Sequence, residues 1–237
     1  MNDRHSLIDT IRAGLTPIHW DGHKFVGAGV VITLLFFLIW SPLGWLALLA
    51  TLYVAYFFRD PTRVTPVREG LIIAPADGTV TSVHLDTPRS ELGLPDMPHS
   101  CVSIFLSIFD VHVNRAPVDG QIVRRIYVPG LYLNAATDKA SEDNEREIMV
   151  FKTASDTEIG VVRIAGLIAR RIITFVREGQ RIEAGARVGL IRFGSRVDIY
   201  IPSAKGILVA EGQRVIGGET VLADMRSDEN GREVRLN

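Results

Sequence analysis

One run of 33 residues, 26–58, contains no Asp, Glu, Lys, Arg or His. A continuous helix of that length would measure about 50 Å, whereas the hydrocarbon core of a bilayer is about 30 Å thick. Pro42 follows Ser41 near the middle of the run and divides it into halves of about 16 residues, each short for a full span. Proline removes a backbone donor and disfavours helix at the residue before it, so the sequence predicts a break there and a helical hairpin over residues 25–58.

Both flanks of this run are cationic. Arg4, Arg12 and Lys24 precede it, and Arg59, Arg63 and Arg68 follow it. Because Lys and Arg accumulate on the cytoplasmic side of membrane segments, a hairpin that keeps both flanks in the cytoplasm fits better than a single span. We therefore expect a monotopic or peripheral protein of the cell (inner) membrane, with its main domain on the cytoplasmic side. A hairpin that crosses the bilayer and one that only dips into it are both compatible with this pattern.

The segment before the hairpin, residues 1–24, is expected to lie at the membrane surface. Its apolar residues have helical spacing: Leu7, Ile8, Ile11, Leu15 and Ile18. This pattern is typical of an amphipathic interfacial helix. A cleaved signal peptide is the alternative, but its apolar region would be much shorter, and no A-x-A-like site follows the run.

From Gly70 onward, short β-branched runs alternate with Gly, Pro and Asp, which predicts strands joined by tight turns over residues 65–237. Two motifs recur there. Residues 74–78 (APADG) return 42 positions later as 116–120 (APVDG), and residues 178–182 (EGQRI) return 33 positions later as 211–215 (EGQRV). The glycine spacing suits hairpin corners that need positive φ. The predicted fold is therefore mainly β, a barrel-sandwich of repeated hammerhead-like β-hairpins.

Composition excludes several functional classes. The net charge of −1 provides no basic field for nucleic acid. The single cysteine, Cys101, leaves no internal disulfide and no cysteine cluster for a metal, and it lies in an apolar run where a small buried hydrophobe is expected. The histidine spacing predicts no metal site either. Residues 138–140 (DKA) match the tripeptide around a lipoylated lysine, but they lie in a polar run outside the repeats. A non-catalytic lipoyl-like or hammerhead membrane module is therefore the non-enzymatic alternative.

Gly194 and Ser195 stand between two strand-like runs, in residues 190–200 (LIRFGSRVDIY). Further motifs precede this pair in order: 75–78 (PADG), 106–112 (LSIFDVH), 129–131 (PGL), Asn134, 139–140 (KA) and 144–146 (NER). In this combination, over residues of about 15 to about 225, the chain resembles phosphatidylserine decarboxylases. Its length is similar to that of their compact bacterial branch.

The resemblance implies a carboxy-lyase that converts phosphatidylserine to phosphatidylethanolamine in the membrane. Decarboxylation of an amino acid needs an electron sink that no side chain provides. The family makes this sink by self-cleavage. Ser195 attacks the Gly194 carbonyl, and elimination and hydrolysis leave a pyruvoyl group that forms a Schiff base with the substrate amine. The products would be chains 1–194 and 195–237, held together as a heterodimer and compatible with a higher oligomer. A pyruvoyl-dependent decarboxylase of another amino-acid-headed substrate is the enzymatic alternative.

Serine attack requires a base, and within the resemblance His112 is the candidate, oriented by Asp77. Longer relatives carry a second histidine where this chain has Arg115. Arg115 and Arg196 are candidates for binding the lipid phosphate, although Arg196 facing solvent is an equal alternative. His84 and His99 are conceivable proton donors that no motif selects. The charged run at residues 143–147 is either a solvated loop or a loop near the active site.

Overall fold

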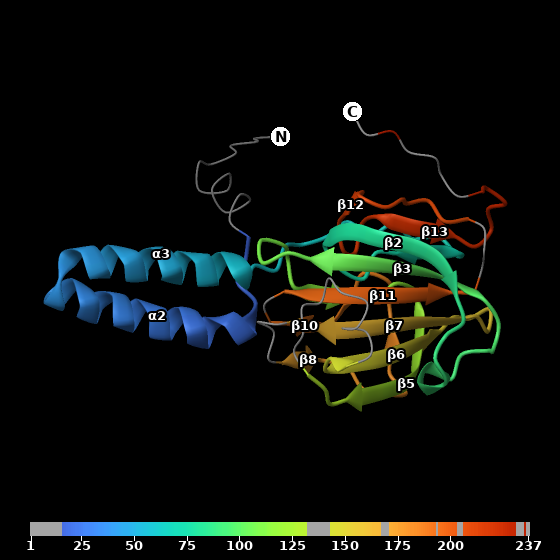
Figure 1. Ribbon diagram of the computed structural model, residues 1–237, viewed down its shortest axis with the longest axis horizontal. Coiled ribbons are helices and arrows are strands. Elements are labelled where there is room, and N and C mark those ends of the chain that lie inside the picture. Colours follow the sequence, from blue (N-terminus) through green and yellow to red (C-terminus); the bar gives the residue numbers. More distant parts are fainter. Residues whose placement is uncertain are drawn as a thin grey trace, which may run out of the picture. The chain divides into compact units, whose positions relative to one another are not determined.

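The computed structural model describes residues 16–131, 143–166, 171–192, 194–202, 206–230 and 235 (Figure 1). The chain divides into two compact units, Met1–Thr62 and Arg63–Asn237. In the described residues the first unit is helical and the second is built from β-strands, which confirms the mainly β fold with an N-terminal apolar helical segment.

The helical unit is a hairpin of α2 (Trp20–Ile39) and α3 (Ser41–Phe57). The hydroxyls of Thr33 and Thr51 lie 3.2 Å apart and link the two helices. The chain reverses at Trp40, whose backbone is extended, and not at Pro42 as predicted. Pro42 is accommodated in the first turn of α3, because a backbone N–H at that position would have no acceptor within the helix.

Helix α2 also begins five residues before the predicted start at 25. The N–H of Asp21 donates to Nδ1 of His19, which caps the helix, and Lys24 pairs with Asp21 at 2.8 Å within the first turn. Residues 20–24 therefore belong to the hairpin. The rest of the predicted surface segment lies largely in residues 1–15, outside the described residues.

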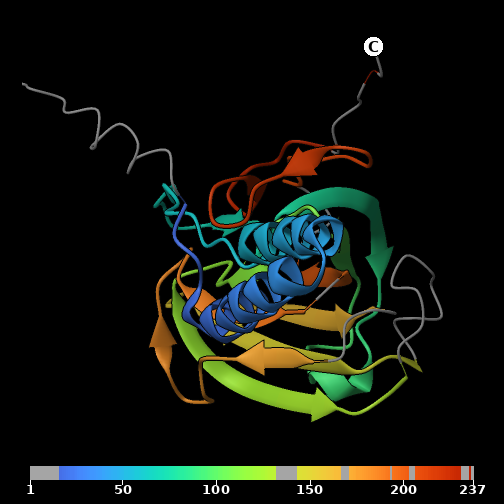
Figure 2. The ribbon, with the colours of Figure 1, turned by 90° about the vertical axis from the view of Figure 1, so that its left-hand side faces the viewer.

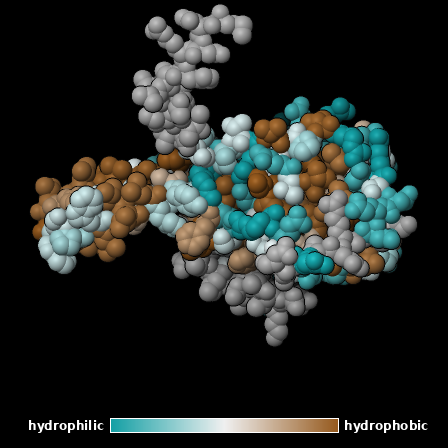
Figure 3. Space-filling model, turned by 90° about the horizontal axis from the view of Figure 1, so that it is seen from above, coloured by the Kyte–Doolittle hydropathy of each residue, from teal (hydrophilic) through white to brown (hydrophobic). Residues whose placement is uncertain are grey.

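The face of the hairpin seen in Figure 3 is largely brown, that is, apolar. The large apolar side chains that are more than half exposed include Leu34, Leu38, Ile39, Trp45, Leu46 and Leu49. By length and composition α2 is able to cross a membrane, whereas α3 is apolar but shorter. An exposed apolar surface of this extent fits contact with lipid.

The β unit contains thirteen described strands and one short 3-10 helix, η1 (Ser90–Leu92). The strands are β1 (Leu71–Ile73), β2 (Gly78–Asp86), β3 (His99–Leu106), β4 (Val113–Arg115), β5 (Gly120–Val128), β6 (Arg146–Lys152), β7 (Glu158–Ala165), β8 (Ile172–Thr174), β9 (Arg181–Ile182), β10 (Arg187–Ile191), β11 (Ser195–Ile201), β12 (Arg214–Val215) and β13 (Val221–Asp224). They form an eight-stranded sheet, a three-stranded sheet and a two-stranded sheet, all antiparallel in their pairing.

The strand order of the eight-stranded sheet is symmetric about its centre. Its order is β12-β2-β3-β11-β7-β6-β5-β9, so β12, β2, β3 and β11 in one half correspond to β9, β5, β6 and β7 in the other. The small sheets repeat in the same way, because β1 pairs with β13 as β4 pairs with β10. Figure 2 shows the sheet strongly curved, with the red C-terminal segment next to the blue-green β2. The β unit is therefore an internal two-fold repeat.

In each half of the unit, the glycine of one recurring motif makes the same backbone hydrogen bond to the strand that follows the other motif. Gly212 N–H donates to Val80 O at 2.8 Å, and Gly179 N–H donates to Ile122 O at 2.7 Å. The repeated motifs are thus the interlocking corners of the fold, and their glycines have the positive φ that was expected. The φ values are +84° at Gly179, +77° at Gly185, +82° at Gly212 and +83° at Gly218.

Alternate residues of the central strand β11 face two separate cores. Val197, Ile199 and Ile201 join the main core between the sheets, while Tyr200 joins a smaller cluster on the other face. Cys101 belongs to the smaller cluster and is 2% exposed, and burial raises the pKa of its thiol to about 12. It is a buried apolar residue, as predicted.

Candidate active site

Ser195 is the first residue of β11 and lies where three strand ends meet. It pairs with Leu106, the last residue of β3, and with Ala165, the last residue of β7. We call this the Ser195 end of the eight-stranded sheet. The Ser195 side chain is fully buried, and its Oγ has no hydrogen-bond partner among the described residues. An unpaired buried hydroxyl is costly to retain, which marks it as a functional candidate.

Gly194, the residue before Ser195, is hydrogen-bonded at both its carbonyl and its N–H. Gly194 has φ +64°, a left-handed conformation that favours glycine. Its carbonyl oxygen accepts a hydrogen bond from the N–H of Gly166 at 3.1 Å, and its own N–H donates to Nε2 of His112 at 3.1 Å. A backbone donor on this carbonyl is able to stabilise negative charge on the oxygen if a nucleophile adds to the carbon.

His112 is 2% exposed and its ring is held at both nitrogens. Nδ1 lies 2.9 Å from the carbonyl oxygen of Asp110, and Nε2 accepts the Gly194 N–H. Because a backbone N–H can only donate, Nε2 carries no proton and the ring proton lies on Nδ1. The unprotonated nitrogen therefore lies one residue from Ser195, on the Gly194 N–H and not on the Ser195 hydroxyl.

The turn at residues 107–110 supports this ring. The N–H and the hydroxyl of Ser107 both donate to Oδ2 of Asp110 at 2.8 Å, and Arg214 donates to Oδ1 at 2.5 Å. Burial alone would raise the pKa of Asp110, but these hydrogen bonds outweigh it and hold the pKa below its ordinary value. The turn thereby fixes the Asp110 carbonyl that orients His112.

The predicted pairing of Asp77 with His112 is not present among the described residues. The Asp77 carboxylate instead accepts from the N–H of Gly217 at 2.9 Å and from Nη2 of Arg63 at 2.9 and 2.7 Å. Burial raises the pKa of Asp77 in spite of the Arg63 charge, and the nearby Asp110 charge raises it further. The orienting group for His112 is the Asp110 carbonyl.

The two-fold repeat explains where Asp77 points. Its counterpart Asp119 accepts from the N–H of Ala184 at 2.7 Å, the same corner bond that Asp77 makes with Gly217. The interpretation of Asp119 as a turn residue is therefore confirmed. Asp77 has the same turn role, and it differs by pairing with Arg63 and by its proximity to Asp110.

Neither arginine suggested for phosphate binding presents its guanidinium to a lipid. Arg196 is 8% exposed and makes two contacts of 2.9 Å with Asp198, on the sheet face opposite to Ser195 because side chains alternate along a strand. Arg115 is 5% exposed and donates to the carbonyl of Gly185 at 2.9 Å. Both side chains stabilise the fold, so the geometry does not favour the predicted role.

The charged run at residues 143–147 is not a solvated loop. Asn144 is fully buried and donates from Nδ2 to the carbonyl of Ala165 at 2.7 Å, and the Ala165 N–H donates to the carbonyl of Glu145 at 2.9 Å. Since Ala165 pairs with Ser195, the run lies at the candidate site, and it braces the residue that precedes Gly166. Within it, Glu147 forms a buried ion pair with Arg163. Asn134, residues 139–140 and Phe193 lie outside the described residues.

The two other histidines considered as proton donors lie far from Ser195. His84 pairs with Cys101, five residues along β3 from Leu106, which is about 17 Å. His99 is the first residue of the same strand, is fully buried, and places Nδ1 2.7 Å from the carbonyl of Met97. Neither supplements His112.

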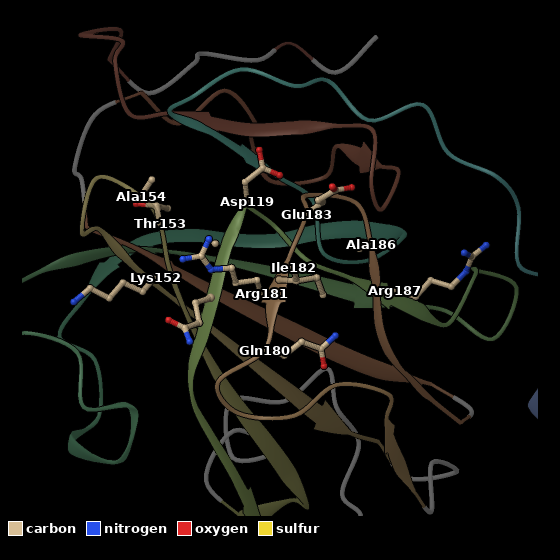
Figure 4. Close-up of a pocket in the computed structure, with 12 residues that line it drawn as sticks. Asp119, Lys152, Thr153, Ala154, Gln180, Arg181, Ile182, Glu183, Ala186 and Arg187 are labelled. Atoms are coloured by element: carbon tan, nitrogen blue, oxygen red, sulfur yellow. The ribbon is translucent and has the colours of Figure 1, made fainter.

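A groove of about 840 Å³ lies at the opposite end of the sheet (Figure 4). It is lined by the beginning of β5, the strand β9 and the residues that follow β6, among them Lys152, Gln180 and Arg181. Lys152 pairs with Glu158, seven residues along β7 from Ala165, or about 23 Å. This groove is separate from Ser195 and is not its substrate site.

Comparison with known proteins agrees with the family resemblance that the sequence motifs indicate. The sequence model described as phosphatidylserine decarboxylase matches residues 50–223. The chain is 52% identical over 226 residues to the phosphatidylserine decarboxylase proenzyme of Nitrobacter winogradskyi, and the match covers 95% of this chain and 91% of the relative.

Proposed function

This chain belongs to the phosphatidylserine decarboxylase family, a family of carboxy-lyases, and from that premise we propose that it cuts itself between Gly194 and Ser195 and then decarboxylates phosphatidylserine to phosphatidylethanolamine. The name proenzyme, carried by the Nitrobacter relative, supports a processed precursor. The observation that carries the proposal is the pair of bonds on Gly194, from Gly166 to its carbonyl and from its N–H to His112.

Self-cleavage begins when Oγ of Ser195 attacks the Gly194 carbonyl carbon. Nε2 of His112 takes the hydroxyl proton, and the Gly166 N–H stabilises the oxyanion. The proton then passes to the Ser195 nitrogen as the amide bond breaks, which leaves an ester between Gly194 and the Ser195 side chain. Removal of the Ser195 Cα proton expels the Gly194 carboxylate, and addition of water releases ammonia and leaves a ketone at residue 195.

The surroundings of Ser195 fit this product. A pyruvoyl group supplies the electron sink for the carbanion that forms when CO₂ leaves. His112 and Gly166 are the described residues that would lie beside it, one as a proton carrier and the other as a hydrogen-bond donor to an oxygen. The site is buried, which favours loss of a charged carboxylate by excluding water.

The cut would leave two chains, 1–194 and 195–237, as one heterodimer. Strand β11 is hydrogen-bonded to β3 on one side and to β7 on the other, so the smaller chain begins at the centre of the sheet. Its later strands β12 and β13 pair with β2 and β1 of the larger chain. These pairings would hold the chains together after cleavage, and assembly into a higher oligomer is compatible with them.

The apolar hairpin favours a substrate that resides in the bilayer over a soluble amino acid. We propose that residues 25–58 anchor the protein in the cell (inner) membrane from the cytoplasmic side, with residues 65–237 as the catalytic domain. The cationic residues on both flanks of the hairpin support that orientation.

The decisive experiment separates self-cleavage from decarboxylation. On a denaturing gel the wild-type protein should run as two chains, and mass spectrometry should find the fragment 195–237 lighter by one ammonia than its sequence requires. Ser195→Ala should give one uncut, inactive chain, and Ser195→Cys should cut slowly. Ser103→Ala, at a buried serine of β3, is the matched control and should cut normally. Two chains from Ser195→Ala would contradict the cleavage site, and a cut wild-type protein without turnover of phosphatidylserine would contradict the substrate.

A further inference from the structure

Two apolar side chains project from the turn that orients His112. Ile108 is 37% exposed and Phe109 is 60% exposed. The turn is closed by the bond from Asp110 N–H to Ser107 O at 2.9 Å and by the contacts of Ser107 with the Asp110 carboxylate. Because the polar groups at both ends of the turn face each other, the two apolar residues between them form its tip.

This tip is immediately next to the reactive bond. Leu106, the strand partner of Ser195, is followed directly by Ser107. His112 lies two positions after Asp110, and its ring contacts Gly194. The tip and the cleavage site are therefore parts of one structural element. A partner that contacts the tip lies within a few residues of Ser195.

Among the described residues, the exposed large apolar side chains of the sheet and its turns are concentrated at the Ser195 end. Those at this end are Ile108, Phe109, Tyr127, Leu131 and Ile216. Those at the other end are Leu85 and Met97. A soluble surface gains nothing from exposed Phe and Leu, so this asymmetry indicates that the Ser195 end meets an apolar partner.

Cationic groups accompany the apolar ones. Arg171 is exposed, and its carbonyl accepts the N–H of Arg192 at 3.3 Å, two residues before Gly194. The Arg214 side chain, 63% exposed, lies on the Asp110 carboxylate beneath the tip. Apolar side chains rimmed by guanidinium groups match an anionic phospholipid surface, in which charged headgroups cover the acyl chains.

We propose that the 107–110 turn is a membrane-insertion loop, which places Ile108 and Phe109 among the acyl chains of the bilayer that holds the substrate. The inference rests on the proposed function, because a lipid keeps its acyl chains in the bilayer while its headgroup reaches residue 195. The partner is an anionic phospholipid bilayer. Insertion brings the Ser195 end to the headgroup layer, so the substrate need not leave the membrane.

The first test compares substrates. Phe109→Ser and Ile108→Ser, in the full chain, should slow decarboxylation on vesicles of phosphatidylserine and phosphatidylcholine by about 10-fold or more, since burying such a side chain is worth about 1.5–3 kcal/mol. The contacts that orient His112 are made by Ser107 and Asp110, so both variants should cut themselves normally and turn over dispersed short-chain phosphatidylserine at the wild-type rate. Leu85→Ser is the matched control, because Leu85 is 57% exposed at the other end, and it should leave both rates unchanged.

The second test detects insertion directly and does not depend on turnover. Cys101 is buried, so in Phe109→Cys an environment-sensitive thiol dye attaches at position 109. Adding the vesicles should increase the dye's fluorescence, and nitroxide-labelled acyl chains should quench it, whereas a dye on Leu85→Cys should respond to neither. A dye at position 109 that stays in water, with normal vesicle turnover by Phe109→Ser, would overturn the insertion loop and leave the proposed function intact. Wild-type protein that is cut yet inactive on phosphatidylserine in both forms would instead refute the proposed function.

Discussion

The backbone nitrogen of Gly166 lies 3.1 Å from the carbonyl oxygen of Gly194. This bond joins the end of β7 to the residue before β11, and on its other side Gly194 contacts His112, at the beginning of the segment that forms β4. Three segments far apart in the sequence thus converge on one residue, Gly194. Its carbonyl, which belongs to the bond to Ser195, accepts from Gly166, and its N–H, which belongs to the preceding peptide bond, donates to His112.

The conformation of Gly194 should control the rate of self-cleavage. Because φ is +64°, Gly194→Ala costs about 1–2 kcal/mol for the left-handed conformation, although no atom of the described residues, the two chain neighbours aside, lies within 4 Å of the added methyl group. Relaxation of this strain would turn the carbonyl away from Gly166. We expect cleavage to slow by about 10-fold, measured as the loss of precursor with time on denaturing gels.

Gly212 provides the matched control for that experiment. It also has a positive φ, +82°, and open space around its Cα, but it lies in a hairpin corner rather than at the cut. Gly212→Ala should lower the free energy of unfolding as much as Gly194→Ala and leave the cleavage rate unchanged. Equal slowing by both variants would mean that cleavage responds to global stability and not to the Gly194 carbonyl.

The repeated corners were predictable because they depend on local chemistry. A glycine at a positive φ with a glutamate before it leaves the same residues at the same spacing in both halves, and Gly179 and Gly212 do occupy equivalent corners. The symmetric strand order was not predictable, because the pairing of β11 with β7 joins residues 30 to 40 positions apart, from Ser195 with Ala165 to Tyr200 with Gly160. The residue pattern of a single strand does not identify the strand with which it pairs.

The site was predictable where side chains carry the chemistry and not where the backbone does. The motif containing His112 led to the correct neighbour of Gly194. Gly166 escaped notice because any residue except proline supplies a backbone N–H, so its type carries no signal. The sequence left a solvated loop and a loop near the active site equally open for residues 143–147, because the buried partner of Glu147, Arg163, comes from a separate strand.

Asp77 and Asp119 form a natural pair for testing the role of Asp77. Asp77→Asn and Asp119→Asn each weaken an equivalent corner bond, to Gly217 and Ala184, and should lower the free energy of unfolding by a similar amount of about 1 kcal/mol. If the Asp77 charge acts on the 107–110 turn through its proximity to Asp110, only Asp77→Asn should slow self-cleavage. Cleavage time courses and urea unfolding of both variants provide the comparison. Normal cleavage by Asp77→Asn would mean that Asp77, like Asp119, only stabilises a hairpin corner.

The Asp110–Arg214 pair predicts a pH dependence of stability. The pKa of Asp110 is held below its ordinary value, so the carboxylate stabilises the folded protein fully above about pH 4, and this stabilisation is lost as the pH falls through the lowered pKa. The difference in unfolding free energy between wild type and Asp110→Asn should therefore be largest near neutral pH and shrink on acidification. Urea unfolding between pH 3 and 7, in the uncut Ser195→Ala background, measures it. A difference that stays constant over this range would contradict the pairing.

His112 should be required for self-cleavage. Its Nε2 is the acceptor beside the Gly194–Ser195 bond, so His112→Ala should accumulate uncut precursor and slow cleavage by about 10²–10⁴-fold. His84→Ala removes an exposed histidine at the other end of the sheet and should cut at the wild-type rate. Gels over a long incubation distinguish slow cutting from none. Cleavage by His112→Ala at the wild-type rate would move the base to another group.

His112 should also serve the decarboxylation itself, because Arg115 does not replace the second histidine of longer relatives. The Arg115 guanidinium donates to the Gly185 carbonyl, and an arginine stays protonated near neutral pH, so it cannot cycle a proton as an imidazole does. Any His112→Ala protein that does become cut should therefore turn over poorly in a single-turnover assay. Arg115→Ala should lower the free energy of unfolding while its cut form keeps a near-normal rate. Normal turnover by cut His112→Ala together with a collapse in Arg115→Ala would reverse this assignment and make the arginine the group that the reaction needs.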